Sequence, residues 1–235
     1  MRRMYEAVLV VAAVTLAGSV SAAQGNMETS KAVAGGGVSV KGWHGQVDAN
    51  EAKGGQTVAN AKLGEEGKAL HVTTGPAIVY WNPANKASGN YTVKATFTEP
   101  KYMSLMSHPH PYGLFIGGND LGTNKESLLY CAAYGNGTFI VRGFGPEPFQ
   151  LNGRHGEANE AVHKAPGPNL PVSQDIALSV KGDKVECAIN GKVVASYNKA
   201  DVVGPNKLKS TDGIYGIRFA HNTDGLVNAL TLTKP

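Results

Sequence analysis

The sequence predicts an all-β protein built from two packed antiparallel sheets. Short runs of alternating apolar and polar residues are separated by turn residues about every ten positions, as in sandwiches and barrels. Turn formers are abundant, with 30 glycines and 12 prolines among 235 residues. This composition disfavours helical arrays, and the presence of only 2 cysteines excludes a disulfide-dense miniprotein.

The first 22 residues have the order of a secretory signal peptide. Arg2 and Arg3 precede an apolar run, Ala7–Ala17, and the segment closes with small residues before the expected cleavage point. The apolar run is shorter than the roughly 20 residues that a membrane span needs. Ser19 stands where a bacterial lipoprotein would carry a lipid-accepting cysteine. We therefore expect a secreted or periplasmic protein without a lipid anchor or integral membrane association.

Residues 23–37 and 38–235 have different characters. The first stretch is small and polar and ends in three glycines, which is typical of a flexible linker. The second shows neither a further linker nor an internal repeat, so we expect a single domain. The formal net charge is +4, but no dense run of lysines or arginines occurs, which disfavours nucleic acid as a partner.

Eleven strands are expected in the domain, each an alternating run bounded by turn residues. They are Ala69–Thr73, Ile78–Trp81, Tyr91–Thr98, Tyr112–Ile116, Leu128–Tyr134, Thr138–Phe144, Gln174–Lys181, Lys184–Ile189, Lys192–Tyr197, Tyr215–Ala220 and Asn228–Thr233.

Two of the turns between these strands specify hairpins. Asn136-Gly137 and Asn190-Gly191 each lie between alternating runs, and Asn-Gly supplies the positive φ of a type I′ turn. The register of the first hairpin predicts that Arg142 lies opposite Cys131, on the face of Ile140. An arginine on a largely apolar face is either buried and paired or forms the floor of a ligand cleft. Arg142 is therefore the main candidate for a binding residue.

Both cysteines fall on apolar faces of central strands. Cys131 shares its face with Leu129 and Ala133, and Cys187 lies on the more apolar side of its hairpin. In an exported protein the two could form one disulfide between the sheets. The alternative is two buried free thiols, because cysteine also behaves as a small apolar side chain.

The meander from Asp175 to Tyr197, with a glycine turn and then an Asn-Gly turn, resembles that of concanavalin A-like lectin and glucanase jelly rolls. Asn90–Thr98 and Gly213–Phe219 are similar to an early and a penultimate strand of that fold. Laminin-G-like modules and the 3-keto-disaccharide hydrolase domain are the most similar groups, over about Trp43 to Lys234. The resemblance implies a two-sheet antiparallel jelly-roll β-sandwich. It does not imply one function, because the fold hosts lectins, hydrolases, lyases and passive modules.

The catalytic signatures of these relatives are missing from the sequence. It contains no Glu-x-Asp-x-x-Glu string, which would place the two carboxylates of a retaining glucanase on one strand. The Gln-x-His and Tyr-x-Lys strands of jelly-roll alginate lyases are also lacking. The nearest carboxylates, Glu157 and Glu160, fall in a predicted loop. Catalysis by these known routes is disfavoured.

The segment from Met103 to Tyr112 is a candidate metal site. In an extended chain His108 and His110 point to the same side about 7 Å apart, and neutral imidazoles so placed can share Zn²⁺ or Cu²⁺. Met103 and Met106 would add thioethers, which suit Cu(I). Two histidines do not complete a site, and the alternative is an ordinary rigid loop. Candidates for a further ligand are Asp120, His155 and His221.

Three further groups of polar or aromatic residues could contact a ligand. Asn119 and Asp120 end a strand and suit sugar hydroxyls or Ca²⁺, although a turn cap explains them equally well. The stretch from residue 144 to 171 is the longest without strand character, and such loops are usually functional or disordered. We expect it to cover one edge of the concave sheet. Aromatic residues that could stack on sugars, or form core, are Trp81, Tyr112, Tyr130 and Tyr134.

These observations predict an exported protein that binds a saccharide without catalysis on its concave sheet. The expected ligand-binding residues are Arg142, Tyr112, Asn119, Asp120, Arg154, His155 and Glu157. The sequence establishes no cofactor, and Ca²⁺, Zn²⁺ and Cu²⁺ are the candidate ions. One alternative is a saccharide-active hydrolase or lyase, acting with or without a metal ion, with His108, His110 and His155 as ligands or bases and Glu157 as the acid. The other is an interaction module whose concave face is filled by apolar side chains.

Overall fold

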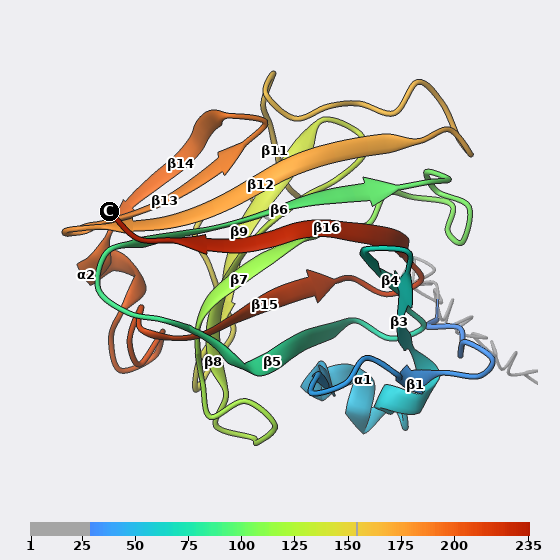
Figure 1. Ribbon diagram of the computed structural model, residues 1–235, viewed down its shortest axis with the longest axis horizontal. Coiled ribbons are helices and arrows are strands. Elements are labelled where there is room, and N and C mark those ends of the chain that lie inside the picture. Colours follow the sequence, from blue (N-terminus) through green and yellow to red (C-terminus); the bar gives the residue numbers. More distant parts are fainter. Residues whose placement is uncertain (1–28, 154) are drawn as a thin grey trace, which may run out of the picture.

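The computed structural model describes residues 29–153 and 155–235, which form two sheets packed face to face (Figure 1). The first sheet has the order β1 (Gly37–Val38), β3 (Lys62–Glu66), β4 (Ala69–Thr73), β16 (Asp224–Thr233), β6 (Tyr91–Glu99), β12 (Val172–Lys181), β13 (Lys184–Ile189) and β14 (Lys192–Asn198). The second has the order β10 (Phe149–Gln150), β9 (Thr138–Phe144), β8 (Ser127–Ala133), β7 (Tyr112–Asn119), β15 (Gly213–Phe219), β5 (Ile78–Ala87) and β2 (His44–Val47). The remaining strand, β11 (Glu157–Ala158), pairs with β9.

The predicted fold class, an antiparallel jelly-roll β-sandwich, is confirmed. All eleven expected strands are present, and several extend a few residues beyond their predicted ends. Of the strands that sequence reasoning missed, β1, β2, β10 and β11 are two to four residues long, too short for alternation to be recognised. The fifth, β3, has a single large apolar residue, Leu63, and therefore no alternation. The helices are equally short: α1 (Ala49–Lys53), the 3₁₀ turn η1 (Val58–Asn60) and α2 (Lys199–Val202). None of the helices in the described ranges is long and apolar enough to cross a bilayer.

Alternate residues of the second sheet face opposite sides. Leu129 and Cys131 of β8 point into the core between the sheets, whereas Leu128 and Tyr130 belong to a smaller cluster on the outer face. The disulfide between Cys131 and Cys187 joins β8 to β13, and therefore one sheet to the other, with 6.2 Å between the Cα atoms. Of the two alternatives left open by the sequence, the structure thus has the disulfide.

The Asn136-Gly137 hairpin has a different register from the one predicted. The Asn136 side chain accepts hydrogen bonds from the amide and hydroxyl of Thr138, and only Gly137 of the pair has positive φ, at 90°. This Asx turn makes a three-residue loop, which shifts the strand pairing by one residue. Arg142 consequently lies opposite Tyr130 instead of Cys131, and it faces outward from the sandwich.

The Asn190-Gly191 hairpin agrees with its prediction. Both residues have positive φ, 49° and 83°, and Ile189 pairs with Lys192 across a two-residue loop. A bulge between Cys187 and Ala188 shifts the pairing farther along the strands.

The predicted signal peptide, residues 1–22, lies outside the described residues, and the predicted linker 23–37 is described only from residue 29. In this part, the amide of Lys31 donates to the Asn222 side chain and the amide of Val33 donates to the carbonyl of Asn60. The amide of Gly37 donates to the carbonyl of Ala61. Residues 31–37 are therefore attached to the domain, in contrast to the flexible linker that their composition predicts.

Candidate functional site

An open cavity of about 650 Å³ lies on the outer face of the second sheet. Its floor comes from outward-facing residues of β8, β9 and β15, and its walls come from the loop before β7, the turn after β15 and the segment after β9. The side chains that line it are mostly aromatic, cationic or amide. They include His108, His110, Tyr130, Tyr134, Asn136, Arg142, Gln150, His155, Arg218 and His221. Seven residues singled out in the sequence thus line one cavity: Arg142, His108, His110, His155, His221, Tyr130 and Tyr134.

The segment from residue 144 to 171 forms one side of this cavity, because two of its short strands pair with β9. Phe149 and Gln150 of β10 lie beside Gly143 and Arg142, and β11 pairs with the other end of the same strand. The segment therefore covers one edge of the second sheet. It supplies Gln150 and His155 to the lining of the cavity.

A buried ion pair stands beside the cavity. The guanidinium of Arg218, on β15, donates to the Asp48 carboxylate over 2.5 Å, and the two side chains are 8% and 21% exposed. The Arg218 guanidinium also lies over the rings of Tyr130 and Phe144, 5.4 and 5.5 Å from their centroids. Burial raises the pKa of Asp48, and the Arg218 charge opposes that shift.

A second groove of about 680 Å³ adjoins the first, and His221 borders both. Its lining includes three acidic residues, Asp48, Glu51 and Glu126. Burial raises the pKa of Glu126 to about 7, and the Asp48 carboxylate adds to this effect. The Glu126 Oε2 atom is buried without a hydrogen-bond partner among the described residues. A carboxyl group of this kind can hold or release a proton near neutral pH.

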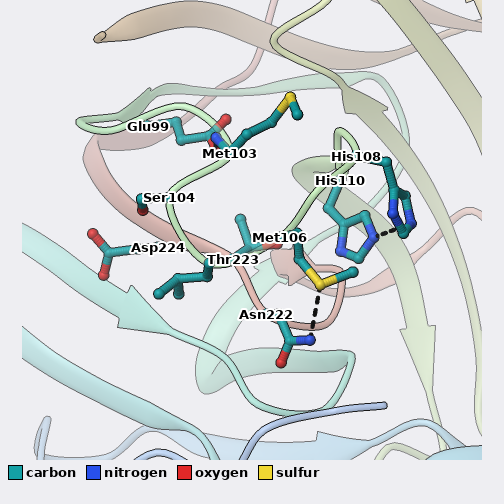
Figure 2. Close-up of a pocket in the computed structure, with 10 residues that line it drawn as sticks. Glu99, Met103, Ser104, Met106, His108, His110, Asn222, Thr223 and Asp224 are labelled. Carbon is teal, nitrogen blue, oxygen red and sulfur yellow. Dashed lines mark hydrogen bonds between the residues drawn. The ribbon is translucent and has the colours of Figure 1, made fainter. Parts of the chain in front are cut away.

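Three histidines converge at the rim where the two grooves meet. One ring nitrogen from each of His108, His110 and His221 lies within 4.8 Å of the other two. The Nε2 atoms of His108 and His110 are 2.9 Å apart, and the rings of His110 and His221 stack with centroids 4.2 Å apart. Figure 2 shows the contact between His108 and His110 as a dashed line. Of the further ligands that the sequence offered, His221 thus joins the pair, whereas His155 and Asp120 are not in this cluster.

Asn222 holds the segments that carry these histidines. Its side chain donates to the carbonyl of Thr29 and to the sulfur of Met106, and it accepts from the amide of Lys31. Figure 2 shows Met106 against Asn222, close to His110, while Met103 lies on the Glu99 side of the loop. The next residue along the chain from His221 therefore fixes both the N-terminal segment and the loop before β7.

Several residues predicted to bind ligand lie away from the cavity. Tyr112 is 1% exposed and stacks on Phe97 and Phe219 between the sheets, so it is a core residue. Tyr112 lies on the side of β7 that faces the core, together with Leu114 and Ile116. Tyr112 therefore does not line the cavity, which corrects the prediction that it binds a ligand.

Asn119, Asp120 and Glu157 also lie elsewhere. The Asn119 amide donates to the carbonyls of Gly117 and Asp212, and Asp120 pairs with Lys209, so both side chains have their partners at the end of β7. Glu157 is exposed on β11 and does not line the cavity. The remaining candidate, Arg154, lies outside the described residues.

The site contains residues that sequence reasoning did not select, among them Asp48, Glu126, Arg218 and Asn222. Arg218 had a detectable signal, since it is a single cation in the alternating run of β15, as Arg142 is in β9. Asp48, Glu126 and Asn222 lie in turns, where acidic and amide residues are common for local reasons. Only their packing against distant strands distinguishes these three residues from ordinary polar residues of connecting segments.

No protein-family model matches the sequence, and no curated protein matches it. Among solved structures, the carbohydrate-binding module CBM66 from Bacillus subtilis is similar over 84% of this chain and 98% of its own, with 8% identity and a TM-score of 0.54. A Bacillus subtilis protein of unknown function with a galectin-like fold matches 82% of this chain and 89% of its own, with 13% identity and a TM-score of 0.49. Sheep galectin-11 matches 63% of this chain and 92% of its own, with 11% identity and a TM-score of 0.40. The first likeness confirms the lectin-type jelly-roll fold expected from the sequence.

Proposed function

We propose that this protein binds a saccharide in the cavity on the outer face of the second sheet. The observation that carries the proposal is the lining of that cavity, where Arg142, Gln150 and Asn136 supply donors and acceptors beside the rings of Tyr130 and Tyr134. Sugars present hydroxyl groups at their edges and C–H groups on their faces, so hydrogen-bonding and aromatic side chains together suit them. The structural likeness to a carbohydrate-binding module supports the same class of ligand.

The test is calorimetric titration of the chain with a panel of soluble glycans, followed by Arg142→Ala. We expect at least one glycan class to bind and the variant to weaken its affinity at least tenfold, because a charge-assisted hydrogen bond is worth roughly 1.5–3 kcal/mol. Lys192→Ala removes one positive charge from an exposed position on β14, in the other sheet, and serves as the matched control. An unchanged affinity in Arg142→Ala would remove the central residue of the proposal.

A second candidate function is a saccharide-active hydrolase or lyase. Glu126 favours it, because its raised pKa and buried Oε2 are expected of a general acid or base, and its groove shares His221 with the cavity. In this reading Glu126 takes the role of acid that the sequence assigned to Glu157. The two functions are separated by product analysis of every glycan that binds: turnover that Glu126→Gln abolishes without loss of affinity supports the enzyme. Binding without turnover supports the lectin-like function.

We further propose that the protein is exported to the periplasm or secreted. The proposal rests on the signal-peptide pattern of residues 1–22, and the disulfide between Cys131 and Cys187 fits an oxidising compartment. Mass spectrometry of the protein expressed in a bacterial host should find an N-terminus near Ala23 in the exported fraction. An intact N-terminus on protein that stays in the cytoplasm would contradict it.

A further inference from the structure

We propose that His108, His110 and His221 bind one divalent transition-metal ion, Zn²⁺ or Cu²⁺, at the rim of the saccharide cavity. Ligand nitrogens about 2.0–2.1 Å from a shared ion lie roughly 3.3 Å from one another in a tetrahedral site. In the structure the three ring nitrogens lie within 4.8 Å of one another, and the closest pair is 2.9 Å apart. Closing this difference requires the stacked rings of His110 and His221, which lie 12° from parallel, to turn about their side-chain bonds until their lone pairs converge. The three imidazoles are exposed or half-buried.

The tautomer of His110 leaves a lone pair on the nitrogen that faces His108, where a metal ion would bind. Its Nδ1 contacts the backbone carbonyl of His221, which can only accept, so Nδ1 carries the proton and donates it. The lone pair of the neutral ring then resides on Nε2, the atom that faces Nε2 of His108. A metal-binding histidine typically donates its other ring N–H to a carbonyl or carboxylate in this way.

The same reasoning applies to His221. Ser30 Oγ donates its single proton to Glu51 Oε2 over 2.7 Å, so at 3.3 Å from His221 Nδ1 it serves as an acceptor. The Glu51 carboxylate itself stands 3.9 Å from that nitrogen. His221 therefore donates from Nδ1 toward the Ser30–Glu51 pair, and its Nε2 keeps the lone pair. Two of the three proposed ligands thus have an outer partner that fixes their tautomer.

The backbone holds the three histidines in place without an ion. His108 and His110 each precede a proline, which restricts them to extended conformations. The amide of Ala220 donates to the carbonyl of Pro111, which ties the loop of His110 to the chain beside His221. The buried Asn222 adds its contacts to Met106 and Thr29, as Figure 2 shows for Met106.

The donor set favours particular ions. Three imidazole nitrogens suit Zn²⁺ and Cu²⁺ and do not suit Ca²⁺, which takes oxygen ligands. All three histidines line the cavity of about 650 Å³, so a fourth ligand would come from the cavity side, as water or as a hydroxyl of a bound molecule. The proposal does not depend on saccharide binding, because the metal alone is the probe.

The experiment is titration of the chain, purified without a polyhistidine tag and treated with chelator, with ZnCl₂ or CuSO₄. We expect one ion per chain, and we expect His110→Ala and His221→Ala to weaken binding at least 100-fold. The matched control is His155→Ala, which removes a histidine of the same cavity that lies outside the cluster. It should bind as the unmodified chain does. Ser30→Ala, which removes an outer partner of His221, should weaken binding about tenfold.

A measurement on the unmodified chain covers the case in which a variant fails to fold. The electron paramagnetic resonance spectrum of the one-to-one Cu²⁺ complex should show superhyperfine splitting from three equivalent or nearly equivalent nitrogens. Absence of one-to-one binding up to 100 µM of either metal, in a chain shown to be folded by circular dichroism, would overturn the proposal. So would affinity that survives both His110→Ala and His221→Ala, or a Cu²⁺ spectrum with fewer than three nitrogen ligands.

Discussion

Arg218 and Asp48 form the most deeply buried charge pair near the cavity, and their burial determines what substitution does. Moving two charges from water into a protein interior costs free energy. Each charge of the pair can stay buried because the opposite charge beside it offsets this cost. Arg218 is 8% exposed, and its guanidinium also lies over two aromatic rings. The pair joins β15 to the residue that precedes α1, so it also holds a wall of the acidic groove.

We predict that Arg218→Met destabilises the fold by about 3–5 kcal/mol, because it leaves the Asp48 carboxylate buried without a cation. Adding Asp48→Asn should recover part of this loss, since the uncompensated charge then disappears. Urea unfolding of the two single variants and the double variant measures the coupling. A loss below about 1 kcal/mol in Arg218→Met would show that water already solvates Asp48.

Glu99 gives a second prediction at this scale. Burial raises the pKa of Glu99 to about 7, and the charge of Asp224 adds to this, while a hydrogen bond from the Met103 amide opposes it. The unfolded chain has the ordinary value of 4.5, so the folded state holds the proton more tightly. Below pH 4.5 the two states are protonated alike, and the fold loses stability as the pH rises from about 4.5 to about 7.

The variant that tests this is Glu99→Gln, which keeps an acceptor for the Met103 amide and cannot ionise. The difference in unfolding free energy, variant minus unmodified chain, should be larger at pH 8 than at pH 4. We expect the increase to be on the order of 1–3 kcal/mol. Urea unfolding across this range provides the measurement. A difference that stays constant with pH would show that Glu99 ionises alike in both states.

Among the elements, the β8–β9 hairpin controls the site because its loop sets the direction of Arg142. A two-residue loop would turn Arg142 toward the disulfide, whereas the three-residue loop turns it into the cavity. Gly137 makes the loop possible, with φ of 90°. Gly191 performs the same task in the β13–β14 hairpin, which is remote from the cavity.

We predict that Gly191→Ala costs about 1 kcal/mol of stability, the usual penalty for a side chain at positive φ. Gly137→Ala should cost more, because an added Cβ would also lie 2.5 Å from the Lys164 side chain. Only Gly137→Ala should reduce glycan affinity, since it alone disturbs β9. The control is Gly204→Ala, where φ is not positive and no atom lies within 4 Å. Equal effects of the two hairpin variants on affinity would contradict this assignment.

At the scale of the whole molecule, the two sheets are held by a shared apolar core and by one covalent link. The disulfide between Cys131 and Cys187 closes a segment with a sequence separation of 56. Cross-linking restricts the unfolded chain, and a loop of this length corresponds to about 4 kcal/mol of stabilisation. Both half-cystines are at most 1% exposed within the core cluster.

We predict that Cys131→Ala with Cys187→Ala lowers the midpoint of thermal unfolding by roughly 8–16 °C, from this stabilisation and the size of the domain. Reductant should lower the midpoint of the unmodified chain toward that of the double variant and leave the double variant unchanged. Calorimetric scans with and without dithiothreitol provide the measurement. An unmodified chain that is equally stable in reductant at equilibrium would contradict the expected link.

The sequence determined the sandwich and its main strands, because alternation reports which side of a strand is buried and Asn-Gly reports where a hairpin turns. It also singled out His108, His110 and Arg142, since histidines between prolines and a cation within an apolar run are unusual locally. Only the tertiary structure decided which residues meet. His221 reaches the cavity, Glu126 and Asp48 reach the adjoining groove from separate connecting segments, and Tyr112 enters the core. Strand register and sheet packing bring together such residues, which lie far apart in the chain. Local patterns carry no record of such long-range contacts.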